Sequence, residues 1–210
     1  MDNINYIDMP VSEFTATLAS SSPAPGGGGA SALAAALGAA LACMVGNLTV
    51  GKKKYAENES RLRELIAEAQ SLRERLLALV DADAEAFLPL AAAYRLPKDA
   101  PGRDAVMEKC LADAAAVPME ILELSCRVIA LQEEFAALGS SLAVSDAGTG
   151  AVFAWAAMYG AAMNVLVNTR LMADRERAAD MNRRVNELMQ EYRVKAGRVY
   201  GDIFAKLSDK

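Results

Sequence analysis

Two aspartates, Asp81 and Asp83, lie in a segment that ends in the apolar residues Ala86, Phe87 and Leu88. Side chains two positions apart on a helix point in different directions, so we expect one carboxylate to enter the interior and the other to be solvated. Asp83 precedes Phe87 by four residues and therefore shares its inward face. An apolar environment raises the pKa of a carboxyl group, which suits proton transfer near neutral pH. Asp83 is thus the candidate acid or base, and a purely structural aspartate is the alternative.

The sequence contains no histidine and three cysteines. Without histidine there is no Ser/His/Asp triad, no Cys/His pair and no HExxH zinc site, so proton transfer falls to Asp, Glu, Lys, Tyr or Cys. Cys43, Cys110 and Cys126 are far apart in sequence and have apolar neighbours. Their spacing fits no metal-ligand pattern, so we expect buried thiols in a reducing compartment and no metal site.

The glycine-rich run from Pro25 to Gly29 leads directly into a predicted helix. Gly26, Gly27 and Gly28 let the backbone approach a ligand, and a helix N-terminus presents unpaired N–H groups to an anion or a carbonyl oxygen. A flexible hinge between two helices explains the run equally well. The run lacks the GK[ST] ending of a phosphate-binding loop, and no strand precedes it as in a dinucleotide site.

Lysines gather at the end of the same predicted helix, where Lys52 and Lys53 are followed by Lys54. Positive charge near a helix C-terminus interacts favourably with the helix dipole, which explains the cluster without a ligand. Attraction of an anionic ligand tail is the functional alternative.

Polar residues also mark a second uncharged helix. Ser145 and Asp146 stand at its start, where both residue types favour N-capping, and Asn164 and Asn168 lie one turn apart on one side of it. A buried amide without a partner costs on the order of 1–3 kcal/mol, so both asparagines need hydrogen bonds. Ligand recognition and bonding between helices both satisfy this requirement.

All of these residues are placed on or beside helices by the sequence pattern. Apolar residues recur at helical spacing over 54–96 and 103–138, and further helices are predicted over 11–20, 30–50 and from 146 onward. Pro89 is expected to kink or interrupt its helix, and Pro118 to bend the next one. No alternating strand pattern, internal repeat or linker is evident. The expected fold class is all-α: a single up-and-down multi-helix bundle with long helices, forming one domain over residues 1–210.

Charge and composition narrow the class of partner. The formal net charge of -5 argues against a nucleic-acid surface. Residues 30–50 and 147–169 carry no charge and are long enough to span a membrane. They are rich in Ala and Gly and contain Asn, so we expect burial in the bundle and against a second subunit rather than in lipid. The first ten residues lack the basic and apolar regions of a secretory signal, which predicts a cytoplasmic location.

Together these blocks resemble the cyclodeaminase and cyclohydrolase family, which includes the C-terminal domain of formiminotransferase-cyclodeaminase and bacterial methenyltetrahydrofolate cyclohydrolases. The matching pieces occur in order over nearly the whole chain: Phe14 with Leu18-Ala19-Ser20, Pro23 to Gly28, Met44-Val45 through Leu48-Thr49, Gly51-Lys52-Lys53, Asp81 and Asp83 before Phe87, Leu96-Pro97-Lys98, Val117-Pro118, Ser145-Asp146, and Asn164-Val165 with Asn168. One departure is Gly139-Ser140, where the family usually has Gly-Asn, and it puts in doubt any ligand contact from that position.

The resemblance implies a homodimer with a folate site between helices at or near the subunit contact, and no metal or tightly bound cofactor. It also implies one of two reactions on a tetrahydrofolate derivative as substrate. Cyclodeamination converts 5-formiminotetrahydrofolate to 5,10-methenyltetrahydrofolate and ammonia, whereas cyclohydrolysis opens the methenyl ring with water to give 10-formyltetrahydrofolate. We favour cyclodeamination, with cyclohydrolysis as the alternative and a non-catalytic helical dimer or scaffold as the second alternative.

On this resemblance, Asp83 is the catalytic residue that carries the proton from the attacking nitrogen or water to the leaving nitrogen. The substrate-binding residues divide into two groups. The pterin group is expected to contact the segment containing Ser145 and Asp146 together with Asn164 and Asn168, and the glutamate carboxylates are expected to contact Pro25, Gly26, Gly27 and Gly28 with Lys52 or Lys53.

Overall fold

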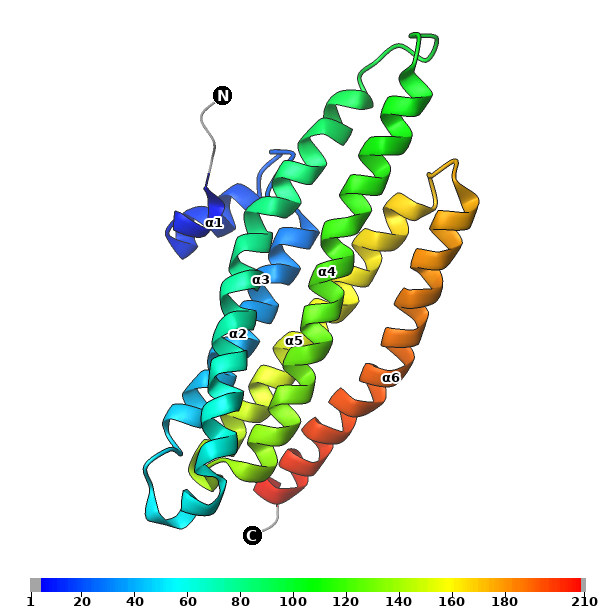
Figure 1. Ribbon diagram of the computed structural model, residues 1–210. Helices are drawn as coiled ribbons and strands as arrows, with labels where there is room; N and C mark the ends of the chain where they lie inside the picture. The colour runs from blue at the N-terminus through cyan, green and yellow to red at the C-terminus, as the bar shows by residue number, and fades with distance from the viewer. Residues whose placement is uncertain (1–4, 209–210) are drawn as a thin grey trace.

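The computed structural model describes residues 5–208, and every regular element in that range is a helix (Figure 1). The N-terminal stretch used above to argue against a secretory signal lies partly outside the described residues. In chain order the elements are η1 (Tyr6–Asp8), α1 (Val11–Leu18), α2 (Gly27–Asn47), η2 (Lys53–Asn58), α3 (Glu59–Ala93), α4 (Arg103–Leu138), η3 (Ser141–Ala143), α5 (Val144–Thr169) and α6 (Arg175–Ser208).

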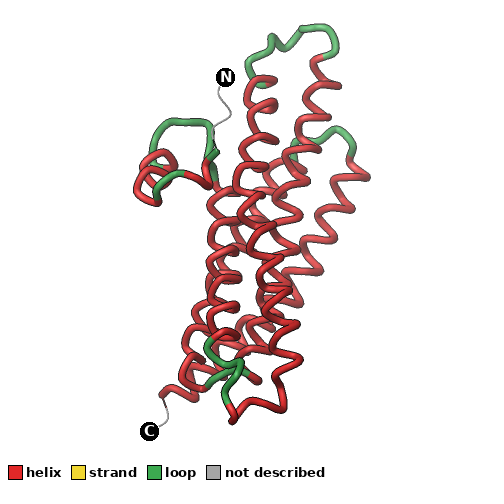
Figure 2. The backbone as a smooth tube through the Cα atoms, turned by 60° about the vertical axis from the view of Figure 1, so that its left-hand side comes forward, coloured by secondary structure: helices red, strands yellow, loops and turns green. Residues whose placement is uncertain are grey.

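The helices α2 to α6 run up and down alongside one another (Figures 1 and 2). The helices α2, α3, α4 and α5 surround a shared core, and α6 packs against α4 and α5. The short elements η1 and α1 form an N-terminal arm beside α3, held by the buried side chains of Tyr6 and Phe14. The all-α bundle of long helices predicted from the sequence is confirmed.

Small residues bring the backbones of α2 and α5 into close contact. A Cβ atom at Gly38 would lie only 2.9 Å from the carbonyl oxygen of Gly150 and 3.5 Å from the backbone nitrogen of Ala154. Between them, the buried side chain of Gln132 donates a hydrogen bond from Nε2 to the Gly38 carbonyl oxygen over 2.8 Å. The centre of the bundle is therefore fixed by backbone contacts that larger side chains would prevent.

The start of α2 differs from the sequence prediction. We expected the glycine run to lie outside regular structure, yet the helix begins at Gly27 rather than at Ala30. Gly28 and Gly29 are both buried against α3, where a Cβ at Gly28 would collide with the carboxylate of Asp83. Tertiary packing thus overrides the low helix propensity of glycine at these positions.

Proline does not interrupt α3. The helix passes through Pro89 and continues to Ala93. Leu90 and Ala93 are both buried, in a small apolar cluster with residues of α4 and Met172 at the upper end of the bundle. Their burial offsets the hydrogen bond that the proline ring removes, so of the predicted kink or interruption the interruption is wrong.

The predicted N-cap of α5 is also wrong. The helix begins at Val144, its N-cap position is Ala143, and no side chain makes a capping hydrogen bond there. The preceding 3-10 helix η3 leads the chain directly into α5, so Ser145 and Asp146 already belong to the first helical turn. Their carboxylate and hydroxyl groups are therefore not used as caps.

The two uncharged helices are covered only in part. Both α2 and the segment Ser141–Thr169 have the length and hydropathy of a membrane span, and 61% and 44% of their most apolar windows are buried within the bundle. Core helices of non-membrane proteins meet the same criteria. The predicted burial of the three cysteines is confirmed, because Cys43, Cys110 and Cys126 are buried free thiols.

The contact between α2 and α5 gives a first prediction. In Gly150→Ala, the new methyl group displaces the Gln132 amide from the Gly38 carbonyl oxygen. We expect the free energy of unfolding to fall by about 1–3 kcal/mol, as is typical of overpacking in a dense core. Urea denaturation followed by circular dichroism at fixed protein concentration measures the change.

The matched control is Gly201→Ala in α6, where a Cβ atom meets nothing within 4 Å. This substitution should raise stability by up to about 1 kcal/mol, because alanine is the better helix former. Equal effects of the two substitutions would contradict the packing argument.

Candidate active site

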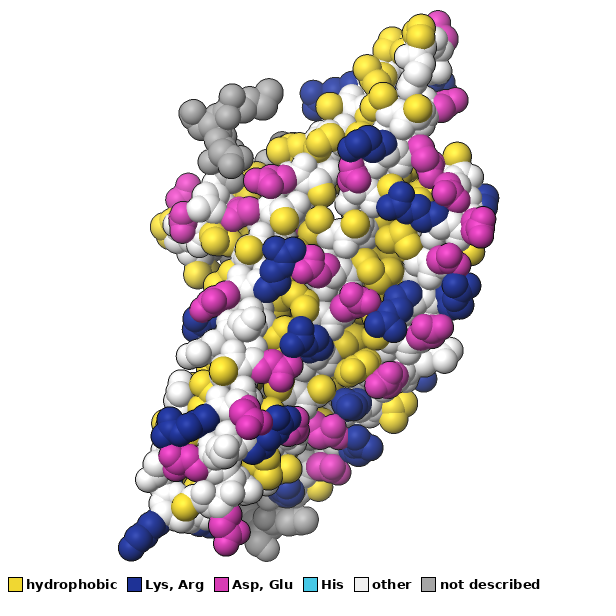
Figure 3. Space-filling model, viewed as in Figure 1, with side chains coloured by type: hydrophobic (Ala, Val, Ile, Leu, Met, Phe, Trp, Pro, Cys, Tyr) yellow, Lys and Arg dark blue, Asp and Glu magenta, His cyan; other side chains and the backbone are white. Residues whose placement is uncertain are grey.

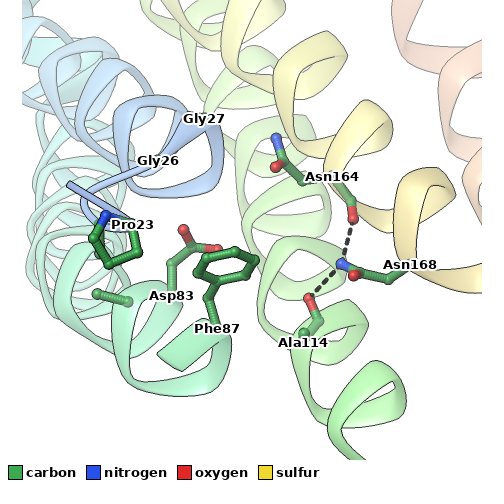
Figure 4. Close-up of a pocket in the computed structure, with 10 residues that line it drawn as sticks. Pro23, Gly26, Gly27, Asp83, Phe87, Ala114, Asn164 and Asn168 are labelled. Atoms are coloured by element: carbon green, nitrogen blue, oxygen red, sulfur yellow. Dashed lines mark hydrogen bonds between the residues drawn. The ribbon is translucent and has the colours of Figure 1, made fainter. Parts of the chain in front are cut away.

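A cavity of about 180 Å³ lies between the N-terminus of α2 and the helices α3, α4 and α5 (Figure 4). Its lining comes from four segments of the chain and, among the described residues, includes one ionisable side chain and two side-chain amides. The lining residues are Pro23, Ala24, Gly26, Gly27, Asp83, Ala84, Phe87, Ala114, Asn164 and Asn168.

The cavity exists because α3 and α5 extend beyond the N-terminus of α2. Gly29, in the first turn of α2, is level with Asp83 of α3, and α3 continues ten residues further to Ala93. At 1.5 Å per residue, α3 extends about 15 Å beyond the start of α2. Asn164 of α5 lies beside Gly27, and α5 also continues beyond it, to Thr169. The space beyond the N-terminus of α2, which a longer α2 would fill, is therefore left open.

Asp83 points into this cavity, as the sequence predicted (Figure 4). Its Oδ2 atom accepts a hydrogen bond from the backbone N–H of Gly29 over 2.8 Å. Burial raises the pKa of the Asp83 carboxyl group above its ordinary value, and the N–H of Gly29 offsets part of this rise. A raised pKa makes the carboxylate a stronger base than an ordinary aspartate, which suits a group that accepts and returns a proton.

The same contact changes the interpretation of the glycine run. The sequence predicted that the N-terminus of α2 would receive an anion or a carbonyl group from a ligand. In the structure the anion is the protein's own Asp83 carboxylate, which takes the favourable position at the positive end of the helix dipole. Gly28 permits this approach because any Cβ atom there would overlap the carboxylate.

Asp81 does not behave as expected. We predicted that the second aspartate would be solvated, but its Oδ1 atom accepts the backbone N–H of Tyr6 over 2.6 Å and the residue is half-buried. Burial raises the pKa of Asp81, and hydrogen bonds from the backbone of the N-terminal arm lower it. Asp81 therefore anchors the arm to α3 and does not line the cavity.

Asn164 and Asn168 face Asp83 across the cavity (Figure 4). Asn168 Nδ2 donates to the carbonyl oxygens of Ala114, over 3.0 Å, and Asn164, over 2.8 Å. Asn164 Nδ2 donates to the carbonyl oxygen of Gly160 over 2.8 Å. These bonds hold both amides to the backbone by their nitrogens, and within residues 5–208 no hydrogen bond engages their side-chain oxygens.

The cavity therefore offers hydrogen-bond acceptors rather than cations. Its polar side chains are the Asp83 carboxylate and two amides with free oxygens, and the described residues that line it include no lysine or arginine. Among the described residues there is also no cluster of three or more His, Cys, Asp or Glu side chains suited to a metal ion. Such a lining favours a ligand that carries positive charge and N–H donors.

The remaining predicted residues divide into two groups. Gly26 and Gly27 line the cavity, while Pro25 and Gly28 lie directly behind the lining, against Gly29 and Asp83. By contrast, Lys52, Lys53, Ser145 and Asp146 lie at the opposite end of the bundle, because they follow the C-terminus of α2 or begin α5. The 21 residues of α2 alone separate the two ends by about 30 Å. A single chain does not bring the predicted lysines or the Ser-Asp pair to its own cavity.

Ser140, the departure from the family pattern, is also at that opposite end. It is buried, and its backbone N–H donates to Oγ1 of Thr49 over 2.8 Å. The neighbouring Ser141 N–H donates to the phenol oxygen of Tyr55 over 3.2 Å. Ser140 therefore helps to close the end of the bundle and does not line the cavity.

Sequence reasoning missed five lining residues, namely Pro23, Ala24, Ala84, Phe87 and Ala114. Phe87 was noted only as a marker of the inward face of α3, and its position one turn after Asp83 could have identified it. Ala114 carries no chemical signal, since its contribution is the carbonyl oxygen that holds Asn168.

The fold and the cavity together define a class of helical bundle with a buried carboxylate opposite two asparagines. The sequence profile of the formiminotransferase-cyclodeaminase family matches residues 10–187, so the chain belongs to this family. It is 37% identical to the methenyltetrahydrofolate cyclohydrolase of Methylorubrum extorquens, over 94% of this chain and 97% of that protein.

Two further relatives are similar over most of this chain. The formimidoyltransferase-cyclodeaminase of Rattus norvegicus is 34% identical over 96% of this chain, which spans 38% of the length of the rat protein. The crystal structure of formiminotetrahydrofolate cyclodeaminase from Thermotoga maritima superposes with a TM-score of 0.88 at 26% identity, covering 95% of this chain and 98% of that one.

The raised pKa of Asp83 predicts how stability depends on pH. The protonated carboxyl group is favoured in the folded state, so its contribution to stability is fully present below the ordinary pKa of aspartate and is lost as pH rises through the raised value. The variant Asp83→Asn has no carboxyl group at this position, so its stability does not show this loss as pH rises. We therefore expect the free energy of unfolding of Asp83→Asn, relative to the parent protein, to increase with pH across this window.

Urea denaturation of both proteins from about pH 4 to about pH 8 tests this expectation. Asp81 is present in both proteins, so its titration cancels in the difference. A difference that stays constant or falls with rising pH would contradict the assigned environment of Asp83.

Proposed function

We propose that the chain is a folate one-carbon enzyme that converts 5-formiminotetrahydrofolate to 5,10-methenyltetrahydrofolate and ammonia, with Asp83 as its proton carrier. The observation that carries this proposal is the placement of Asp83 in a cavity whose other polar side chains, Asn164 and Asn168, have amide oxygens that no hydrogen bond engages within residues 5–208. A protonated formimino group has a positive charge and two N–H donors on its terminal nitrogen. It matches a carboxylate flanked by amide oxygens.

The reaction follows from this arrangement. N10 of the folate attacks the formimino carbon and forms the N10–carbon bond of a tetrahedral intermediate. Asp83 accepts the proton from N10 and gives it to the amino group that came from the formimino nitrogen. The bond between carbon and this nitrogen then breaks, ammonia leaves, and the methenyl cation remains. The single positive charge of the substrate is retained in the product, so Asp83 ends in the state in which it began.

Positioning supplies the rest of the catalysis. Asn164 and Asn168 are held to the backbone through their amide nitrogens, so their oxygens are already oriented toward the cavity. Such preorganised groups lower the barrier because they need not reorient as charge moves. The cationic one-carbon unit is itself electrophilic, and for this reason we propose that no metal or tightly bound cofactor takes part.

Cyclohydrolysis of methenyltetrahydrofolate is the second candidate, and the similarity to the cyclohydrolase of Methylorubrum extorquens favours it. In that reaction Asp83 would take the proton from the attacking water. The methenyl carbon bears a C–H group but no N–H group. The one-carbon unit would therefore offer no N–H donor to the acceptors of the cavity. This chemical difference leads us to place cyclodeamination first.

We also propose that the protein is a cytoplasmic homodimer. The outer sides of α2 and α5 expose apolar side chains, among them Leu37, Met44, Tyr159 and Met163, on helices that carry no charge from Ala30 to Asn47 and from Ala147 to Thr169. A second subunit would remove these side chains from water. The three free thiols suit a reducing compartment.

Replacement of the proton carrier is the direct test of the site. In Asp83→Asn, turnover of formiminotetrahydrofolate should fall at least about 100-fold, the usual scale of general acid–base catalysis. Binding of the substrate, measured by isothermal titration, should weaken less than turnover, because the amide keeps the volume of the carboxylate although it lacks its charge. The matched control is Glu85→Gln, which neutralises an exposed carboxylate on the same turn of α3 and should leave turnover unchanged.

Normal activity in Asp83→Asn would overturn the assignment of the proton carrier. The absence of any saturable folate binding to the parent protein would instead favour a non-catalytic scaffold.

A spectrophotometric assay distinguishes the two reactions. With formiminotetrahydrofolate as substrate, we expect the absorbance of the methenyl product to appear, with release of one ammonia per product. With methenyltetrahydrofolate, we expect its loss to remain close to the spontaneous rate. Strong acceleration of the second reaction, without the first, would establish cyclohydrolysis and reject our first choice.

A further inference from the structure

The proposed substrate carries two carboxylates on its glutamate, and the cavity has no group to receive them. Among its described lining residues the only charged side chain is the Asp83 carboxylate, which already occupies the N-terminus of α2. At about 180 Å³ the cavity is also smaller than the roughly 300–1,000 Å³ of sites that enclose a drug-sized ligand. The reactive end of a folate therefore lies inside, and its acidic tail must extend beyond the mouth.

The cation that directly follows α5 does not solve this problem. Arg170 is exposed and follows Asn168 by two residues. Two positions on a helix correspond to a rotation of about 200°, so Arg170 projects from the side of α5 opposite to the asparagines. The described surface over α3, α4 and α6 shows charges of both signs without a separate basic area (Figure 3). Many of these charges form ion pairs, such as Arg75 with Glu120.

The concentrated basic segment of the described chain is Lys52 to Lys54, at the opposite end of α2. All three lysines are exposed, and none takes part in an ion pair within residues 5–208. A segment of this charge suits a dicarboxylate, but one protomer holds it about 30 Å from its own cavity.

An apolar face without charge connects these two ends. On α2 its exposed side chains are Leu37, Met44 and Leu48, and on α5 they are Phe153, Tyr159, Met163 and Val167. The two sets adjoin, because α2 and α5 pack together from Gly27 beside Asn164 to Gly38 beside Gly150. The cavity borders on the same two helices, because Gly27 at the start of α2 and Asn164 of α5 both line it.

The face is arranged symmetrically about its middle. Gly38 packs against α5 at the level of Gly150 and Ala154, near the centre of both uncharged helices. Gly27 lies eleven residues before Gly38, about 16 Å toward the cavity. Lys52 lies fourteen residues after Gly38, and because α2 ends at Asn47 the lysines lie at a comparable height in the other direction, roughly 15–20 Å.

We propose that a second copy of this chain packs antiparallel on the face formed by α2 and α5, and that the partner's Lys52 and the partner's Lys53 bind the glutamate carboxylates of the folate. A two-fold axis at the level of Gly38 brings the basic end of one protomer to the cavity end of the other. The apolar middle is then buried, and opposite charges of ligand and protein meet at both ends. This inference rests on the proposed function, and it makes each site incomplete without the partner.

Mixed dimers test whether the lysines act across the subunit contact. One variant is Asp83→Asn, and the other carries Lys52→Glu together with Lys53→Glu. In a mixed dimer, one cavity has an intact Asp83 and receives intact lysines from the other subunit. The two variants alone should show little turnover at low substrate concentration. Mixing them in equal amounts, with subunit exchange, should restore about a quarter of the parent activity, because half of the dimers are mixed and each has one complete site.

If the lysines act within their own protomer or take no part, mixing restores nothing, and the inference is overturned. It is also overturned if the parent protein sediments as a monomer. Failure of the proposed function can be told apart, because the parent protein itself would then convert neither formiminotetrahydrofolate nor methenyltetrahydrofolate. The charge control is Lys206→Glu, on the exposed end of α6, which should leave the kinetics unchanged.

A truncated substrate separates tail binding from damage to the fold. For formiminotetrahydropteroate, which lacks the glutamate, the parent protein and the double lysine variant should have the same KM. For the complete substrate, the variant should raise KM at least about tenfold, with kcat little changed, because the lost interaction is equal in the ground and transition states. An equal loss with both substrates would contradict a role for the lysines in binding the tail.

Discussion

The hydrogen bond from the Gly29 N–H to the Asp83 carboxylate links the start of α2 to α3, and the geometry of the site depends on it. A helix N-terminus leaves backbone N–H groups without partners, and a buried carboxylate needs donors. Each group satisfies the other here. The approach requires glycine at position 28, since any side chain would occupy the position of the carboxylate. This one contact therefore determines where α2 begins, where the Asp83 side chain points and which groups form the base of the cavity.

This contact also sets the electrostatic character of the site. Because Asp83 takes the anion position of the helix, the cavity is suited to a cation and not to a second anion. Across the cavity, Asn164 and Asn168 use their N–H groups on the carbonyl oxygens of α4 and α5 and leave oxygen atoms toward the ligand. The result is a small space lined with acceptors, which fits a cationic one-carbon group and leaves the acidic part of a folate to be bound elsewhere.

The same small residues that build the core expose an uncharged face. Close packing of α2 on α5 requires Gly and Ala along their shared edge, and the remaining sides of both helices carry apolar residues without charges. Burial within one bundle covers only part of each helix. The antiparallel dimer that we propose accounts for the rest, and it assigns a purpose to the lysines that one protomer leaves far from its cavity.

The sequence alone determined the class of fold and the aspartate that enters the cavity, which we propose as the proton carrier. Helical spacing of leucines in 54–96 and 103–138 depends only on local periodicity, and α3 and α4 follow it closely. Asp83 was predicted for the same reason, because a residue four before Phe87 shares its face of the helix.

Tertiary structure decided what depends on contacts between distant parts of the chain. Helix propensity predicted that α2 would begin after the glycines. Packing against α3 instead makes the helix begin at Gly27. Burial of Leu90 and Ala93 carried α3 through Pro89. The solvated role expected for Asp81 was wrong because the N-terminal arm, 75 positions away, covers it. Motif matching grouped Lys52, Lys53, Ser145 and Asp146 with the glycine loop, whereas the length of α2 separates them. The order of residues in a sequence does not give the distance between them. In a rigid helix that distance is set by the rise per residue.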